Sequence, residues 1–269
     1  MKIIDLTISS KRGTMIPVTI CESDIVPAKL LICAHGFKAN RTEDGRFLTV
    51  AKELAKHGVM AVMPGFAGCD ESKEDFLFYT FESCLDDIDS VYEYVKKYYE
   101  ITDDVGMIGY SMGGRLTAMY IRSHPEIKCI GLWAAASYDG FNGEDSYLGM
   151  KLEEMWPQIE EKGYVDFHNG FDDTWIKLNG ELIKGSRDLP VEKGLKEFEG
   201  CALVVHGDED DTVPYSVAKH SYECLEKARI RKLVTVHEAD HGFGQWNGRP
   251  ELSKQLTDAT IAFFEEHFL

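Results

Sequence analysis

The stretch that decides the fold is DVGMIGYSMGG, residues 104–114. Residues 104–110 have the apolar character of a buried strand, and a helix is expected to begin at Met112. Gly109 and Gly113 flank Ser111 two residues away on each side, which gives the pattern G-x-S-x-G. A sharp turn from strand to helix has no room for bulky neighbours, and it lifts the serine hydroxyl above the edge of the sheet. The pattern in this context predicts that Ser111 is a nucleophile.

On both sides of this turn, apolar strand-like runs alternate with segments of helical periodicity. The predicted strands cover residues 30–35, 58–64, 104–110, 128–137, 201–206 and 232–238, after an N-terminal hairpin of 2–8 and 15–20. The predicted helices cover residues 44–57, 80–99, 112 to about 124, 214–228 and 251–268. Such alternation is typical of an α/β fold with a mostly parallel central sheet covered by helices on both faces.

Residues 138–199 interrupt this rhythm and are rich in aromatic side chains. Asn179-Gly180 lies between two strand-like runs, which predicts a hairpin turn there. The segment leaves the carboxyl end of one core strand and returns before the next, where α/β sheets bind ligands. We therefore expect a core of residues 1–137 and 200–269, with 138–199 as an inserted cap subdomain.

A serine nucleophile needs a base, and the base needs a carboxylate to orient it. His241 follows the last predicted strand, at the same edge of the sheet as Ser111, and His168 in the inserted segment is its remaining rival. The loop after strand 201–206 offers four acids in a row, Asp208 to Asp211. The residues identify this loop as the source of the triad carboxylate, but they do not single out one of the four acids. Asp210 is our choice. The chain order Ser, acid, His is that of the α/β-hydrolase triad.

An acyl-transfer intermediate also needs two N–H donors for its oxyanion. The backbone of Met112, at the start of a helix, should supply one. The backbone of Phe37, in the His35-Gly36-Phe37 turn after strand 30–35, should supply the other. A plain structural turn at 35–37 is the alternative.

Composition excludes several classes of function. The formal net charge of -17, from 29 basic and 46 acidic residues, argues against a nucleic-acid or anionic-membrane partner. No apolar run has the length of a membrane span and no signal peptide is evident, so a cytoplasmic protein is expected. The seven cysteines have no CxxC spacing and are expected to be reduced core residues. No metal or phosphate motif occurs, so no cofactor is expected.

Four motifs together resemble the α/β-hydrolase superfamily: HGF (35–37), GYSMGG (109–114), HGDEDDTVP (206–214) and ADHGF (239–243). The HGxxDxxVP pattern of that superfamily selects Asp210 among the four acids. More narrowly, HGF, the stretch YLGMK (147–151) and the place of the insertion resemble bacterial cinnamoyl and feruloyl esterases. That resemblance implies a small ester substrate with a hydroxycinnamoyl group, held by cap aromatic residues such as Trp156, Tyr164 and Trp175. The loop at 66–72, FAGCDES, departs from the FRGHGES of such esterases.

Other functions stay open on the same scaffold. A monoacylglycerol or lysophospholipid lipase, or a peptidase, would use the same triad. Acidic residues among the cap aromatics, such as Glu153 and Asp172, favour a small, partly polar substrate over a lipid. A ligand-binding sensor that kept the fold without turnover is the alternative from another class. The sequence does not fix the assembly, for which a homodimer is one candidate.

Overall fold

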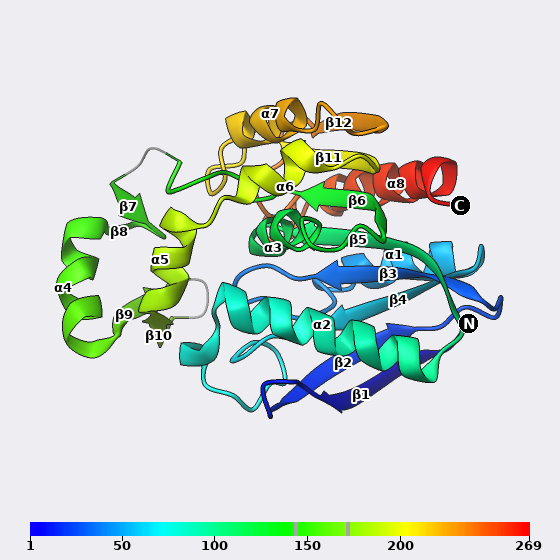
Figure 1. The fold of residues 1–269 in the computed structure, drawn as a ribbon. Coiled ribbons are helices and arrows are strands. Elements are labelled where there is room, and N and C mark those ends of the chain that lie inside the picture. The colour runs from blue at the N-terminus through cyan, green and yellow to red at the C-terminus, as the bar shows by residue number, and fades with distance from the viewer. Residues whose placement is uncertain (143–144, 171–172) are drawn as a thin grey trace.

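The computed structural model describes residues 1–142, 145–170 and 173–269. Within these ranges an eight-stranded sheet has the order β1-β2-β4-β3-β5-β6-β11-β12 (Figure 1). β2 pairs antiparallel with both β1 and β4, and the other neighbours pair in parallel. The strands are β1 Ile3–Ser9, β2 Met15–Cys21, β3 Ala28–Ala34, β4 Val59–Pro64, β5 Ile101–Tyr110, β6 Ile127–Trp133, β11 Cys201–Gly207 and β12 Ile230–Val236. The mostly parallel sheet confirms the predicted α/β-hydrolase fold.

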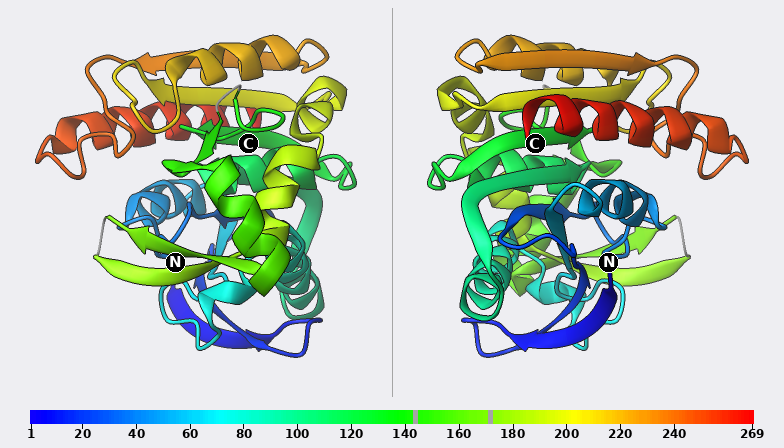
Figure 2. Two further views of the ribbon diagram at one scale, coloured as in Figure 1. Left: turned by 90° about the vertical axis from the view of Figure 1, so that its left-hand side faces the viewer. Right: turned by 90° about the vertical axis from the view of Figure 1, so that its right-hand side faces the viewer.

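Helices cover both faces of this sheet. Figure 2 shows α1 (Arg46–Ala55) and α8 (Pro250–His267) on one side and α2 (Phe81–Tyr98) on the other. α3 (Met112–Tyr120), α6 (Val191–Glu197) and α7 (Tyr215–Cys224) contribute to the same apolar core as α2. Successive strand side chains point to opposite faces, so Leu31 of β3 packs with α1 while Leu30 and Ile32 pack on the other side. Burial on both faces is the reason that these strands are continuously apolar.

One predicted strand is shorter in the structure. The run 128–137 was expected to be extended throughout, but β6 ends at Trp133. Ala134 has a positive φ of 41°, which turns the chain out of the sheet. The apolar run extends beyond Trp133 because Ala134 and Ala135 are buried, although the strand has ended.

The chain between β6 and β11 forms several elements beyond the ends of the core strands (Figure 1). They are β7 Ser146–Tyr147, β8 Met150–Lys151, α4 Leu152–Lys162, β9 Tyr164–Asn169, β10 Thr174–Asn179 and α5 Gly180–Asp188, before α6. β9 and β10 form an antiparallel pair, in which Asn169 faces Thr174. α6 packs against α3 and α7 of the core.

The predicted hairpin turn at Asn179-Gly180 is wrong. Asn179 is instead the N-cap of α5, where its side-chain oxygen accepts a hydrogen bond of 2.8 Å from the Glu181 N–H. Asparagine favours both tight turns and helix N-caps, and here the second role prevails. Gly180 is required by packing, because a Cβ there would lie 2.6 Å from Ile159 of α4.

All seven cysteines are free and buried, as expected of small core residues. Among the described residues, we find no helix with the length and apolarity needed to span a membrane.

Candidate active site

Ser111 lies on the turn between β5 and α3, and the backbone there is strained. Its φ of 52° and ψ of -113° are unfavourable for a residue with a side chain. A Cβ on Gly109 would lie 2.1 Å from the Gly113 carbonyl oxygen, and one on Gly113 would lie 1.9 Å from that of Ala34. Only glycine fits at either position, so the G-x-S-x-G spacing follows from the packing of the helix against the strand ends.

The structure brings Ser111, His241 and Asp210 together. The Ser111 Oγ lies 3.0 Å from His241 Nε2, and His241 Nδ1 lies 2.7 Å from Asp210 Oδ2. A proton on Nδ1 that is donated to the carboxylate leaves Nε2 free to accept from the serine hydroxyl. Ser111 follows β5, Asp210 follows β11 and His241 follows β12. The three loops meet at the carboxyl edge of the sheet. This arrangement can activate a serine for nucleophilic attack.

Asp210 is held in its ionised form. Burial by itself would raise its pKa, but hydrogen bonds from His206 and His241 outweigh burial and hold that pKa well below its usual range. The other carboxylate oxygen, Oδ1, accepts the Thr212 N–H at 2.9 Å and the Val213 N–H at 2.8 Å. The imidazole of His241 therefore faces a fixed negative charge.

The other acids of this loop point elsewhere. Asp208 binds the exposed ring of His237, with Oδ2 2.7 Å from Nδ1, and Glu209 and Asp211 are exposed. His168, the rival base, pairs with Asp173 inside the inserted segment at 2.9 Å. Among the four acids, the geometry thus brings Asp210 to His241.

The two backbone groups expected to bind an oxyanion lie on neighbouring turns. Ala34 at the end of β3 pairs in register with Gly109 at the end of β5, so the turns that carry Phe37 and Met112 are adjacent. Within the described ranges, neither the Phe37 nor the Met112 N–H donates a hydrogen bond to another residue. Met112 is also the first residue of α3, where the helix dipole favours negative charge.

A buried ion pair supports these turns, and the sequence analysis did not predict it. The Glu43 carboxylate accepts the Gly36 N–H at 2.6 Å and pairs with Arg46 at 3.0 Å. Arg46 also donates to the Gly242 carbonyl oxygen at 3.1 Å, beside His241. Burial raises the pKa of Glu43 to about 7, against the opposing effect of Arg46. The two residues are three apart, a spacing that in sequence is typical of an exposed helical ion pair.

The three cap residues predicted to hold substrate make their contacts inside the inserted segment. Trp156 packs under the guanidinium of Arg187, 4.9 Å from the ring centre, and Tyr164 lies beside Lys162 and Lys177. Trp175 is 71% exposed and lies beside His168.

A different set of aromatic rings gathers around Phe37, one of the two predicted oxyanion donors. Phe37 makes edge-to-face contacts with Phe76, Tyr79 and Phe167, at centroid distances of 5.2, 6.0 and 6.4 Å. Phe167 comes from β9 of the inserted segment, and Phe76 and Tyr79 come from the chain before α2. No local sequence signal marks this group, because its members meet only in the folded chain.

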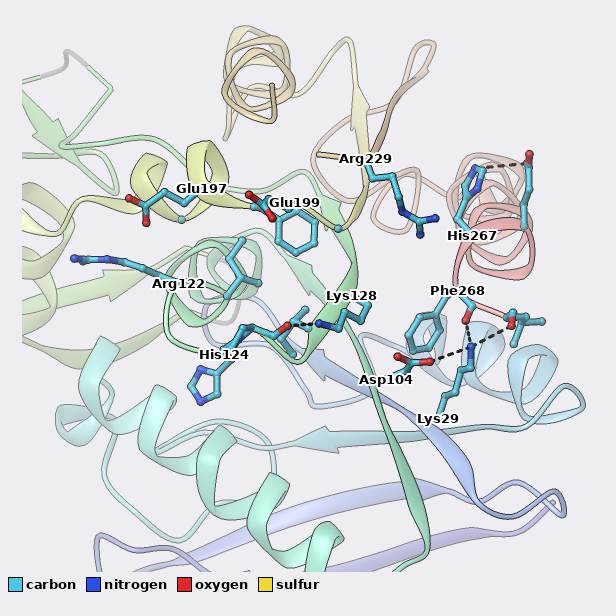
Figure 3. Close-up of a pocket in the computed structure, with 18 residues that line it drawn as sticks. Lys29, Asp104, Arg122, His124, Lys128, Glu197, Glu199, Arg229, His267 and Phe268 are labelled. Carbon is cyan, nitrogen blue, oxygen red and sulfur yellow. Dashed lines mark hydrogen bonds and ion pairs between the residues drawn. The ribbon is translucent and has the colours of Figure 1, made fainter. Parts of the chain in front are cut away.

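A cavity of about 710 Å³ lies at the opposite edge of the sheet (Figure 3). Its lining includes Lys29, where β3 begins, and Lys128 near the start of β6, together with the last residues of α8. The ammonium of Lys29 is bound there by main-chain oxygens at the end of the chain. Because ligands of α/β sheets bind at the carboxyl edge, we do not assign this cavity to the Ser111 site.

Comparisons with known proteins agree with this fold. Residues 26–177 match the family described as serine aminopeptidase, S33. Est1E from Butyrivibrio proteoclasticus, solved with ferulic acid bound, superposes with a TM-score of 0.79 at 23% identity, covering 98% of this chain and 99% of that one. An esterase from Exiguobacterium antarcticum gives 0.66 at 22% identity, with 96% and 100% covered. A bromoperoxidase from Bacillus anthracis gives 0.69 at 17% identity, with 97% and 100% covered. At such identities these likenesses show the fold alone. No curated protein matches the chain.

Proposed function

Because the chain belongs to the serine aminopeptidase S33 family of α/β-hydrolases, we propose that it is a serine carboxylesterase in which Ser111, His241 and Asp210 form the triad. The observation that carries this proposal is the unbroken hydrogen-bonded series from Ser111 Oγ through His241 to Asp210, with both links at 3.0 Å or less. The strained serine, aimed from the start of a helix, supports the same role.

The proposed reaction has two steps. Ser111 Oγ attacks the ester carbonyl while His241 Nε2 takes its proton, and the oxyanion is bound by the N–H groups of Phe37 and Met112. The alcohol leaves with the proton from His241, and an acyl-serine remains. Water then attacks the acyl group with the same base, which releases the acid and restores Ser111.

We further propose that the acyl group is aromatic, as in a hydroxycinnamate ester, and that the inserted segment 138–199 forms the cap above it. The support is the contact between Phe37 and Phe167, two half-buried rings beside the proposed oxyanion donors. Phe76 and Tyr79 are almost fully buried and pack behind Phe37. Aromatic side chains favour offset or edge-to-face contact with a bound ring. Phe167 would be the contribution of the cap to this surface.

The nucleophile is tested by labelling the protein with a fluorophosphonate and mapping the modified peptide by mass spectrometry. We expect one adduct, on Ser111, and none in Ser111→Ala. Labelling of Ser111→Ala to the same extent would contradict the proposal.

The substrate class is tested by kcat/KM on methyl ferulate, p-nitrophenyl acetate, a monoacylglycerol and an aminoacyl p-nitroanilide, the last because of the family to which the chain belongs. We expect methyl ferulate to be preferred. Phe167→Ala should raise KM for the ferulate more than for the acetate, whereas Trp175→Ala, an exposed aromatic of the same segment, should change neither. Preference for the glyceride or the anilide would discard the aromatic acyl group and leave the triad in place.

A further inference from the structure

A compact group of metal-ligating side chains lies away from the Ser111 site, between α6 and α7. Glu192 projects from α6, and His220 and Cys224 project from one face of α7, four residues apart. One ligand atom from each of the three lies within 4.8 Å of the others. We infer that Glu192, His220 and Cys224 form a binding site for a divalent transition metal of the zinc class.

The distances within this group can be compared with those between the ligands of such an ion. Cys224 Sγ lies 3.6 Å from His220 Nε2 and 4.0 Å from Glu192 Oε2, and His220 Nε2 lies 2.9 Å from Glu192 Oε1. Tetrahedral zinc with bonds of about 2.0–2.3 Å requires its ligand atoms to be about 3.3–3.6 Å apart. The Cys224–His220 distance matches this spacing. The two glutamate distances involve different carboxylate oxygens, so the carboxylate must turn to offer one oxygen to the ion.

The same geometry argues against a second cysteine nucleophile. In a Cys-His-acid relay, the acid binds one ring nitrogen while the other faces the sulfur. Here Nε2 of His220 faces both the sulfur and the carboxylate. Three different donor groups within 4.8 Å of one another are an arrangement that a metal ion can bridge.

The surroundings allow a cation to enter. His220 and the nearly buried Cys224 line a surface groove of about 660 Å³. Acidic residues such as Asp139 and Glu223 line the same groove, as do Lys193, Lys196 and Lys227. The ammonium of Lys196 binds Glu192 Oε2 at 2.8 Å and must move for a metal to bind. Its side chain is 56% exposed, so it can turn into solvent.

The location connects the site to the inserted segment. The backbone N–H of Glu192 donates to Asp139 Oδ1 at 3.0 Å, and the Asp139 N–H donates to Glu192 Oε1 at 3.3 Å. These bonds join the start of the segment to its end. A metal held by Glu192 and α7 would fasten that junction to the core, and binding to the folded state alone would raise Tm.

The test is a titration of the metal-free protein with Co²⁺, which gives a near-ultraviolet thiolate charge-transfer band when cysteine is a ligand. We expect one equivalent of Co²⁺ to produce the band, and Zn²⁺ to abolish it. Cys224→Ser should lose the band. His220→Ala should weaken binding by at least about tenfold, and Lys196→Ala should tighten it.

His57→Ala is the matched control, since His57 is another half-exposed histidine near a glutamate, and it should bind Co²⁺ like the wild type. Zn²⁺ should raise the Tm of the wild type and not that of Cys224→Ser. Absence of the band in the wild type, its survival in Cys224→Ser, or equal weakening by His57→Ala and His220→Ala would overturn the inference.

Discussion

Asp210→Asn gives the sharpest test of the hydrogen-bonded series. Two backbone N–H groups, from Thr212 and Val213, point at Oδ1 of Asp210 at 2.9 and 2.8 Å. They require an acceptor, so the amide oxygen of the asparagine will occupy that position. Its NH₂ group must then take the place of Oδ2, 2.7 Å from His241 Nδ1. An amide that donates to Nδ1 forces the imidazole proton onto Nε2, which can no longer accept from Ser111.

The wrong tautomer of the base should lower kcat/KM by about 10⁴, which is about 5.4 kcal/mol of transition-state stabilisation. The assay is hydrolysis of p-nitrophenyl acetate at pH 7.5, with Ser111→Ala as the baseline. Asp208→Asn is the matched control in the same loop, because the Asp208 carboxylate binds the exposed His237 ring and the Glu238 N–H at the surface. It should stay within about twofold of the wild type. More than about a tenth of wild-type activity in Asp210→Asn, or an equal loss in Asp208→Asn, would refute the assignment.

Three further predictions concern stability. Ser111→Gly should abolish activity yet raise the free energy of unfolding by about 1 kcal/mol. Relief of about 1–3 kcal/mol of backbone strain exceeds the extra chain entropy of glycine in the unfolded state. Destabilisation of Ser111→Gly in urea unfolding would contradict this prediction. Arg46→Met should lower the free energy of unfolding by about 3–5 kcal/mol in the same assay and should lower kcat/KM. Arg46 binds the Gly242 carbonyl oxygen directly and holds Gly36 through Glu43. An unchanged urea midpoint would contradict the proposed role of the Glu43–Arg46 pair. The pKa of Asp210 is lower in the folded chain than in the unfolded one, so its ionised form adds stability above about pH 4 that is lost as pH falls. The gap in unfolding free energy between wild type and Asp210→Asn should therefore narrow between pH 7 and pH 3.5, and a constant gap would contradict it.

The turn that carries Ser111 was predictable because local sterics determine it. A Cβ at Gly109 or Gly113 would meet backbone atoms about 2 Å away, so the glycines are visible in the sequence wherever this turn occurs. Asp210 was harder to select, since burial distinguishes it from its three acidic neighbours and burial is a property of the folded loop. Asn179-Gly180 suits a turn and a helix N-cap equally well as a sequence pattern. The packing of Gly180 against Ile159 and Gly163 belongs to the folded chain and has no local sequence signal.

The residues proposed to form the substrate surface could not be predicted from local sequence. Phe167 and Phe37 are 130 positions apart, and neither carries a local signal that pairs them. The resemblance to cinnamoyl and feruloyl esterases implied Trp156, Tyr164 and Trp175 as substrate contacts. Trp175 is mostly exposed, whereas Phe167 contacts Phe37. The proposed triad therefore lies on short motifs that backbone geometry constrains, whereas the proposed substrate surface depends on a contact between distant segments, Phe37 and Phe167.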